Sequence, residues 1–252
     1  LGSNLGDRRA ALDRAVLALQ RHPRIHILQV SRWCESAPVG GPPDQPPYCN
    51  GALTLRTDLG PLELLDALAS VEQEWGRRRG SRWSERTLDL DLLVVDDQVL
   101  DTPRLRLPHP RLACRRFVLA PLESLVPQWE DPLSGWSIAE LLERLDQRPA
   151  RILAVECPEP AVASASEALS TMGWSVSSGP EEVASVEAPT FYVTPLARWR
   201  RLASVLRARR VNQPIPPIIA LECEGSDHRA LADEIVAVAA AAICPLQWPA
   251  TP

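Results

Sequence analysis

Two aspartates, Asp89 and Asp91, stand two residues apart in the stretch Thr-Leu-Asp-Leu-Asp-Leu-Leu at positions 87–93. Side chains alternate between the two faces of a β-strand, so this stretch is predicted to be a strand that projects both carboxylates from one side. Two such acids repel each other unless a cation lies between them. Mg²⁺ binds a small number of carboxylates and fills its remaining positions with water and phosphate oxygens. The spacing therefore suits a magnesium site.

An arginine cluster precedes the two aspartates. Guanidinium groups stay charged and bind phosphate oxygens bidentately. A carboxylate metal site beside such a cluster is what phosphoryl or pyrophosphoryl transfer from a nucleotide requires. The alternative is a basic surface loop followed by a half-exposed strand, because the D-x-D pattern is common on amphipathic strands. The cluster consists of Arg77, Arg78, Arg79, Arg82 and Arg86.

A resemblance to a known family favours the first interpretation. The run R-W-x-x-R-T-L-D-L-D-L-L at positions 82–93 resembles the signature of the 6-hydroxymethyl-7,8-dihydropterin pyrophosphokinases. These folate-pathway enzymes move pyrophosphate from ATP to a pterin alcohol and release AMP. Further landmarks follow the family order over residues 1 to about 145. They are Leu1–Arg8, Tyr48–Asn50, Val71–Glu72, Leu107–Leu112 and Arg115–Leu122.

The resemblance implies a role for each matching residue. Asp89 and Asp91 would hold two Mg²⁺ ions and act in catalysis together with Arg77 and Arg86. The remaining nucleotide contacts would come from Glu72, Arg79, Arg82, His109 and Arg115, and the pterin contacts from Ser36, Val39, Tyr48, Asn50, Trp83 and Phe117. Aromatic rings can clamp a flat pterin, and an amide can both donate and accept at its polar edge.

Two departures from the family pattern affect these roles. Ser84-Glu85 stands where members usually have Gly-Pro, which changes the loop's stiffness and adds a negative charge near the phosphates. Arg116 occupies a position that is often small.

The elements that must position these residues follow from hydrophobic periodicity, and the resemblance implies a ferredoxin-like two-layer α/β domain over residues 1–148. Asn4 or Asp7 can cap a helix that runs to about Arg21, and Pro61 fits the first turn of a second helix. Glu72 borders the apolar stripe of that second helix, where spacing alone favours a plain ion pair. Strands are expected over 25–34, 48–57 and 99–107, and short helices over 117–125 and 137–145.

Residues 149–252 are predicted to form a separate small α/β domain, because two apolar strands there alternate with helical segments. The strands, I-L-A-V-E-C at 152–157 and I-I-A-L-E-C at 218–223, precede helical segments at 161–172 and 227–242. The similarity between these two segments is explained equally well by duplication and by chance. A strand is expected at 190–194 and a helix at 196–210. We expect this region to serve assembly or to bind a folate-pathway protein, so a chain cut near Ala150 should keep its activity.

Composition excludes several other classes of function. The formal net charge of −5 argues against general nucleic-acid or membrane-surface binding, and the absence of lysine rules out a Walker-type lysine or a Schiff base. Six cysteines without a C-x-x-C pair indicate free thiols in a reducing cytoplasm. The longest apolar run, Ile235–Cys244, is too short to span a bilayer. Two other hypotheses remain, a single-stranded RNA-binding module and an inactive folate-pathway scaffold.

Overall fold

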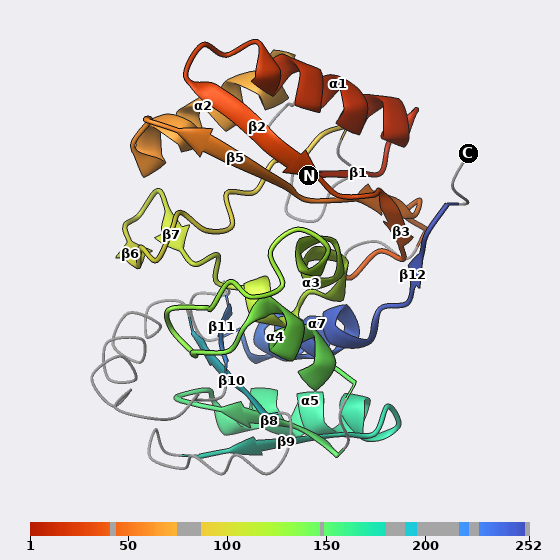
Figure 1. Ribbon diagram of the computed structural model, residues 1–252. Helices are drawn as coiled ribbons and strands as arrows, with labels where there is room; N and C mark the ends of the chain where they lie inside the picture. The colour runs from red at the N-terminus through yellow and green to blue at the C-terminus, as the bar shows by residue number, and fades with distance from the viewer. Residues whose placement is uncertain are drawn as a thin grey trace.

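The computed structural model describes residues 1–40, 44–74, 87–146, 149–179, 190–195, 217–221 and 227–249. Figure 1 shows one group of strands and helices above, a layer of helices in the middle, and a second sheet below. The mixture of sheets and helices confirms an α/β chain. Several predictions fall outside the described residues: the roles of Arg77, Arg79, Arg82, Trp83 and Arg86, and the helix at 196–210.

The first part of the chain combines short strands with helices. Its strands are β1 (Gly2–Ser3), β2 (Ile25–Val30), β3 (Cys34–Ser36), β4 (Tyr48–Asn50), β5 (Leu53–Thr57), β6 (Leu100–Asp101) and β7 (Arg106–Leu107). Its helices are α1 (Arg8–Gln20), α2 (Pro61–Glu74), the 3-10 turn η1 (Leu112–Cys114), α3 (Arg116–Glu123) and α4 (Ile138–Arg144). Strands β1, β4 and β3 pair antiparallel in that order, and β2 pairs with β5.

The helix starts confirm the capping predictions. Asp7 accepts a hydrogen bond from the amide of Ala10 at 3.0 Å, and α2 begins at Pro61. The long strands that the sequence suggested are shorter in the structure. The stretch 48–57 divides at Gly51, where a Cβ atom would lie 2.2 Å from the ring of Trp33. Glycine is therefore needed at this point, because the indole packs directly on the backbone between β4 and β5.

The stretch that carries the two aspartates differs from the predicted regular strand. Only Asp89 pairs with a strand, in an isolated antiparallel bridge to Gly2. Its amide donates to the carbonyl of Gly2 at 2.8 Å, and the amide of Gly2 donates back at 2.9 Å. The alternation of faces nevertheless holds, since Leu88 and Leu90 are buried while Asp91 is exposed.

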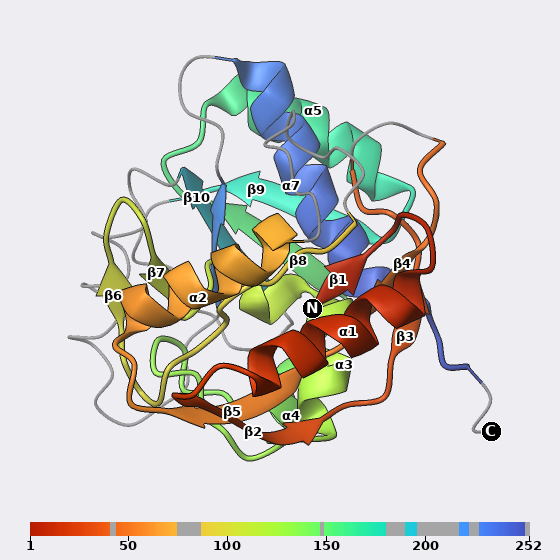
Figure 2. The same ribbon diagram turned by 90° about the horizontal axis from the view of Figure 1, so that it is seen from above.

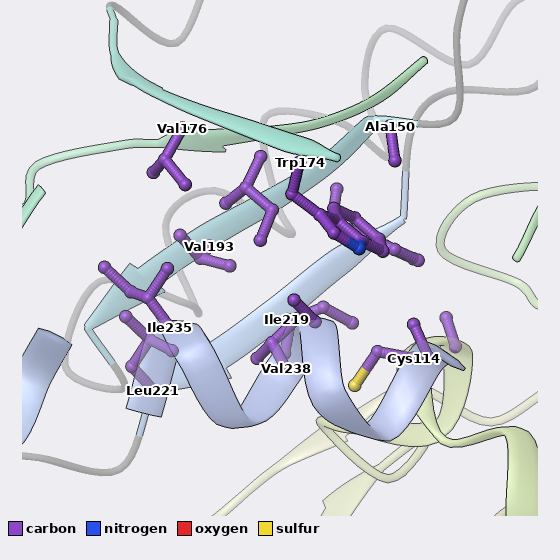
Figure 3. Close-up of a cluster of buried hydrophobic side chains, with 14 of the residues drawn as sticks. Cys114, Ala150, Trp174, Val176, Val193, Ile219, Leu221, Ile235 and Val238 are labelled. Carbon is purple, nitrogen blue, oxygen red and sulfur yellow. The ribbon is translucent and has the colours of Figure 1, made fainter. Parts of the chain in front are cut away.

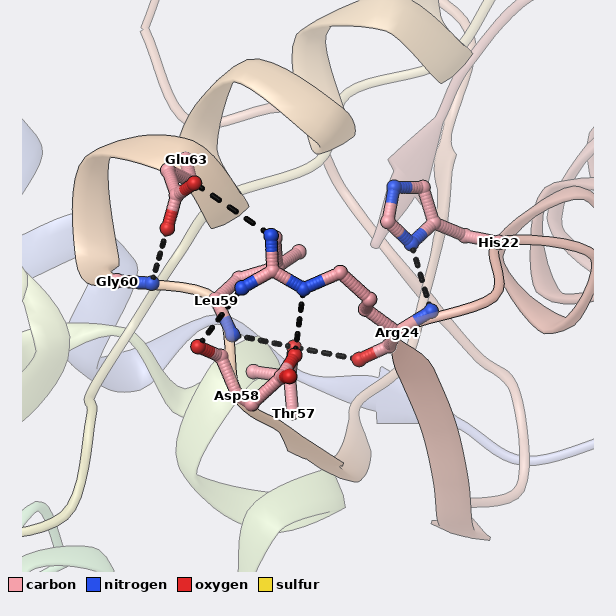
Figure 4. A network of polar contacts seen from close by, with 7 residues as sticks. All are labelled: His22, Arg24, Thr57, Asp58, Leu59, Gly60 and Glu63. Atoms are coloured by element: carbon pink, nitrogen blue, oxygen red, sulfur yellow. Dashed lines mark hydrogen bonds and ion pairs between the residues drawn. The ribbon is translucent and has the colours of Figure 1, made fainter.

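A polar network joins the start of β2 to the start of α2 (Figure 4). The Arg24 guanidinium donates to Asp58 at 2.7 Å and lies 3.5 Å from the Glu63 carboxylate. Glu63 in turn accepts from the amide of Gly60 at 2.8 Å. The hydrogen bond from Arg24 lowers the pKa of Asp58 below its ordinary value. These contacts lie at the first turn of α2, the helix that carries Glu72 near its other end.

The second part of the chain contains the predicted small parallel sheet. Its elements are β8 (Ala150–Ala154), α5 (Glu159–Ser170), β9 (Trp174–Ser178), β10 (Thr190–Pro195), β11 (Ile218–Leu221), α7 (His228–Ile243) and β12 (Leu246–Gln247). Strands β11, β10, β8 and β9 lie in that order, and every neighbouring pair is parallel. Within the described residues, no helix is both long and apolar enough to cross a membrane.

Helix α7 lies between the two parts of the chain. Nine of its sixteen residues are buried, and a helix that is apolar on all sides must be covered on all sides. Figure 3 shows Val238 beside Ile219 and Ile235 beside Leu221, both on β11, with Cys114 from η1 near one end of the helix. Figure 2 shows α7 running beside α5 over the parallel sheet. One apolar cluster includes α3, α4, the parallel sheet and α7, so the two parts share a core.

The chain end returns to the first sheet. Leu246 and Gln247 of β12 pair antiparallel with Ser36 and Glu35 of β3, so the complete order is β1-β4-β3-β12. Arg32 also donates to the carbonyl of Pro249 at 2.9 Å. The predicted domain boundary near residue 148 therefore separates two sequence regions that share a sheet and an apolar core.

Arg116, one of the two departures from the family pattern, belongs to this contact. Its Nε donates to the carbonyl of Ala242 at 2.9 Å, and its two terminal nitrogens contact the carboxylate of Asp146. A small residue at position 116 could not hold the end of α7 in this way.

Candidate functional site

A cavity of about 260 Å³ lies where the first sheet, α3 and α7 meet. Both aspartates of the D-x-D stretch line this cavity. The other predicted site residues that line it are His109, Arg115, Ser36, Val39, Tyr48, Asn50 and Phe117. The structure thus brings together nine of the residues that the sequence analysis assigned to catalysis, nucleotide binding or pterin binding.

Two basic side chains face Asp91 from the loop before α3. The Arg115 guanidinium donates to Asp91 at 3.1 Å, and Nε2 of His109 lies 4.0 Å from the same carboxylate oxygen. Asp91 is 40% exposed, while Arg115 and His109 are 20% and 19% exposed. The three groups therefore form a polar edge of the cavity that a solvated anionic ligand can reach.

Backbone contacts fix the imidazole of His109. Its amide donates to the carbonyl of Leu93 at 2.7 Å, and its Nδ1 accepts from the amide of Arg111 at 3.1 Å. Because Nδ1 accepts, the neutral ring carries its proton on Nε2, the nitrogen that faces Asp91. His109 is thus oriented to donate a hydrogen bond into the cavity.

Glu72 contacts the backbone of the D-x-D stretch. Its side chain is buried, and its carboxylate accepts from the amide of Leu90 at 2.8 Å. Leu90 lies between the two aspartates, so Glu72 holds the backbone of the D-x-D stretch. Glu72 is absent from the residues that line the described cavity. Its role as a nucleotide ligand stays a prediction, and the described contact holds the backbone between Asp89 and Asp91.

The predicted pterin side of the cavity is built on β3, β4 and α3. The amide nitrogen of Asn50 donates to the hydroxyl of Ser36 at 2.9 Å, which orients the remaining amide oxygen. Phe117 lies at the start of α3 with the Arg115 guanidinium 6.0 Å from the centre of its ring. An oriented amide and an aromatic ring on one cavity can bind a flat heterocycle with a polar edge.

The donor set fits a hard divalent cation. Asp89 and Asp91 line the same cavity, and carboxylate oxygens are ligands that Mg²⁺ prefers. Within the described ranges, no group of three or more His, Cys, Asp or Glu side chains could by itself hold a metal ion. A metal here would therefore depend on water and on a ligand's phosphate oxygens for its other positions, as Mg²⁺ does in nucleotide sites.

The sequence analysis missed the residues that α7 contributes. Ala237, Val238 and Ala241 line the cavity, although they lie in the region predicted to form a separate domain. The relevant signal was the run Ile235–Cys244, because a helix without a polar face packs against neighbours on both sides. Cys114 also lines the cavity, and burial raises the pKa of its thiol to about 11, so it is protonated at neutral pH.

Comparisons with known proteins identify relatives of this chain. Residues 1–127 match the family described as 7,8-dihydro-6-hydroxymethylpterin-pyrophosphokinase (HPPK). A 2-amino-4-hydroxy-6-hydroxymethyldihydropteridine pyrophosphokinase of Pseudomonas aeruginosa is 46% identical over 142 residues, which cover 56% of this chain and 86% of the relative. An enzyme of the same name from Synechocystis is 43% identical over 146 residues, or 58% of this chain and 74% of the relative.

A third relative carries its match within a longer chain. The bifunctional protein FolKE of Lactococcus lactis is 41% identical over 126 residues, which are 50% of this chain and 36% of that protein. The family model covers half of this chain, and the Pseudomonas relative is matched over most of its length. The chain therefore belongs to the 7,8-dihydro-6-hydroxymethylpterin-pyrophosphokinase family.

Proposed function

We propose that the cavity around Asp89 and Asp91 is where this chain carries out its family's reaction, ATP-dependent pyrophosphoryl transfer to hydroxymethyldihydropterin in folate biosynthesis. One observation carries the proposal. Two acids, a cationic edge and an aromatic and amide surface line the same cavity. The site thus has groups for a polyphosphate and for a pterin beside each other.

Each side of the cavity contributes a different part of the reaction. Arg115 and His109 bind phosphate oxygens and stabilise the charge that develops during transfer. Asn50 and Phe117 orient the pterin so that its hydroxymethyl oxygen faces the β-phosphorus of ATP. The bond from that oxygen to the β-phosphorus forms as the bond between the β-phosphorus and the bridging oxygen of the α-phosphate breaks. The hydroxyl proton passes to water, and AMP leaves with the bridging oxygen. Much of the rate comes from this alignment of two bound substrates.

Asp89 and Asp91 would hold two Mg²⁺ ions against the triphosphate. Bound metal would neutralise phosphate charge and orient the transferred group. The Arg115 guanidinium donates to Asp91 at 3.1 Å. Nucleotide binding would let this guanidinium exchange the carboxylate for a phosphate oxygen, because both are bidentate anionic partners.

The assay combines purified chain, ATP, Mg²⁺ and 6-hydroxymethyl-7,8-dihydropterin, and identifies the adenine product. AMP is the expected product, and stoichiometric ADP would contradict pyrophosphoryl transfer. A chelator should abolish turnover, and added Mg²⁺ should restore it. Pterin binding without turnover would instead indicate an inactive scaffold.

Matched substitutions test the two acids. Asp89→Asn and Asp91→Asn keep the side-chain shape and remove the charge, so each should lower kcat by orders of magnitude. Asp97→Asn is the control, since Asp97 is exposed on a neighbouring turn and lies outside the cavity. Near-normal rates in both cavity variants would show that the carboxylates only cover a solvent face.

We also infer the finer architecture from the family resemblance. Residues 1–148 would form the ferredoxin-like two-layer domain, which the packing of α1 against α2, β1 and β2 supports. Residues 149–252 would form a second α/β unit. A folate-pathway protein bound through that unit remains a proposal, and co-purification of such an enzyme with the full chain would test it.

A further inference from the structure

We infer that α7 forms one wall of the substrate cavity and that Ala241 limits the size of the group accepted on the pterin side. The inference extends the proposed function to a helix outside the part of the chain that the family model matches. Ala237, Val238 and Ala241 line the cavity, and their side chains are buried. The spacing of four residues places Ala237 and Ala241 on one face of the helix.

The direction of α7 relates its residues to the two sides of the cavity. Near its middle, Glu234 contacts Arg111 at 3.0 Å, next to the loop that carries His109. At the C-terminal end of α7, the thiol of Cys244 donates to the carbonyl of Ala37 at 3.6 Å. Ala37 lies between Ser36 and Val39, two predicted pterin contacts. The helix thus runs from the nucleotide side to the pterin side, and Ala241 lies towards the pterin side.

Several contacts hold this wall in place. Arg116 binds the carbonyl of Ala242, one residue from Ala241. Strand β12, which follows α7, pairs with β3 and places Leu246 opposite Ser36. The wall is therefore fixed to the same strand that supports Asn50 through Ser36.

Small side chains on a fixed wall leave room that a larger side chain would fill. A packed site has few voids, and additional methylene groups force neighbouring atoms to shift. Leucine at position 241 would compete for the space of the pterin ring. The nucleotide phosphates lie towards Arg115 and His109, so the same change should leave ATP binding almost unchanged.

The test is a size series in the full chain: Ala241→Ser, Ala241→Val and Ala241→Leu. The KM for hydroxymethyldihydropterin should rise with side-chain volume, reaching about 10-fold to 100-fold for leucine. The KM for ATP should change less than about twofold, a split that general destabilisation would not produce. Ala240→Leu is the matched control, because Ala240 lies on the same helix outside the cavity lining.

Each outcome separates this inference from the proposed function. If the unmodified chain makes no AMP, the proposed function fails. If the unmodified chain makes AMP and the pterin KM is the same in the whole series, the wall inference is overturned. Should the leucine variant fail to fold, the order of alanine, serine and valine still decides the question. Parallel loss for both substrates in folded variants would also overturn it.

Discussion

The buried pair Arg111–Glu234 makes a quantitative prediction about how the two parts of the chain are joined. Its atoms are 3.0 Å apart, and the two side chains are only 7% and 5% exposed. Glu234→Gln keeps the volume of the side chain but leaves the Arg111 charge buried without its anionic partner. Removing one partner of a buried pair costs about 3–5 kcal/mol. For a chain of this size, that cost lowers Tm by roughly 6–20 °C.

Urea unfolding and thermal scans of the full chain measure this loss. Asp66→Asn is the control, because Asp66 and its partner Arg104 are 61% and 58% exposed. Exposed pairs contribute about 0–1 kcal/mol, so the control should unfold almost like the unmodified chain. Comparing the two variants separates the effect of burial on stability from the effect of losing a carboxylate charge.

A third variant measures the net contribution of the ion pair to the free energy of unfolding, as distinct from the cost of removing one partner. Arg111→Met combined with Glu234→Leu replaces both charges by apolar groups, and such replacements are often neutral or stabilising. Stability within about 1 kcal/mol of the unmodified chain, or above it, is expected. If Glu234→Gln loses no more stability than the surface control, water reaches the pair, and the pair does not join two packed surfaces.

Three further predictions concern the site, the thiols and the chain end. Phe117→Ala should weaken pterin binding in calorimetry and leave the affinity for an unreactive ATP analogue within a few-fold, whereas equal loss for both ligands would place the ring in the core. Burial raises the pKa of Cys34 and Cys157 to about 12 and of Cys114 to about 11, from the ordinary thiol value of 9.0. The folded chain therefore keeps protons that the unfolded chain loses, so urea midpoints should fall as pH rises above about 9; unchanged midpoints between pH 8 and 10.5 would contradict this. A chain that ends at residue 148 should lose pterin turnover, since it lacks α7 and β12. A folded fragment with full activity would contradict the inference that α7 forms a wall of the substrate cavity.

The last of these predictions reverses an expectation from the sequence, and the reason is physical. Local patterns predicted the elements well, since caps and apolar periodicity depend on neighbours in the chain. The Asp7 cap, the start of α2 at Pro61 and the parallel strands of the second part all agree with the structure. Contacts between distant segments leave little local trace, so the pairing of β12 with β3 could not be predicted.

The residues of the candidate site also divide into those that the sequence predicted and those that depend on packing between distant segments. Its charged and aromatic members were found because carboxylates, arginines and aromatic rings have chemistry that can be recognised in a sequence. The alanines of α7 have no such chemistry, and their place at the cavity follows only from packing. Glu72 is intermediate: its place at the border of an apolar stripe was visible and favoured an ion pair, but its backbone partner at Leu90 was not visible.

The return of the chain end to β3 also affects how the protein is made. Arg32 and Pro249 are in contact although they are 217 residues apart in the sequence. A ribosome adds about 5–20 residues per second, so roughly 10–40 s pass between the synthesis of β3 and the synthesis of β12. During that interval the β3 edge is open, and an open edge can pair with another chain. Nascent chains should therefore be able to pair with one another through β3 until β12 emerges.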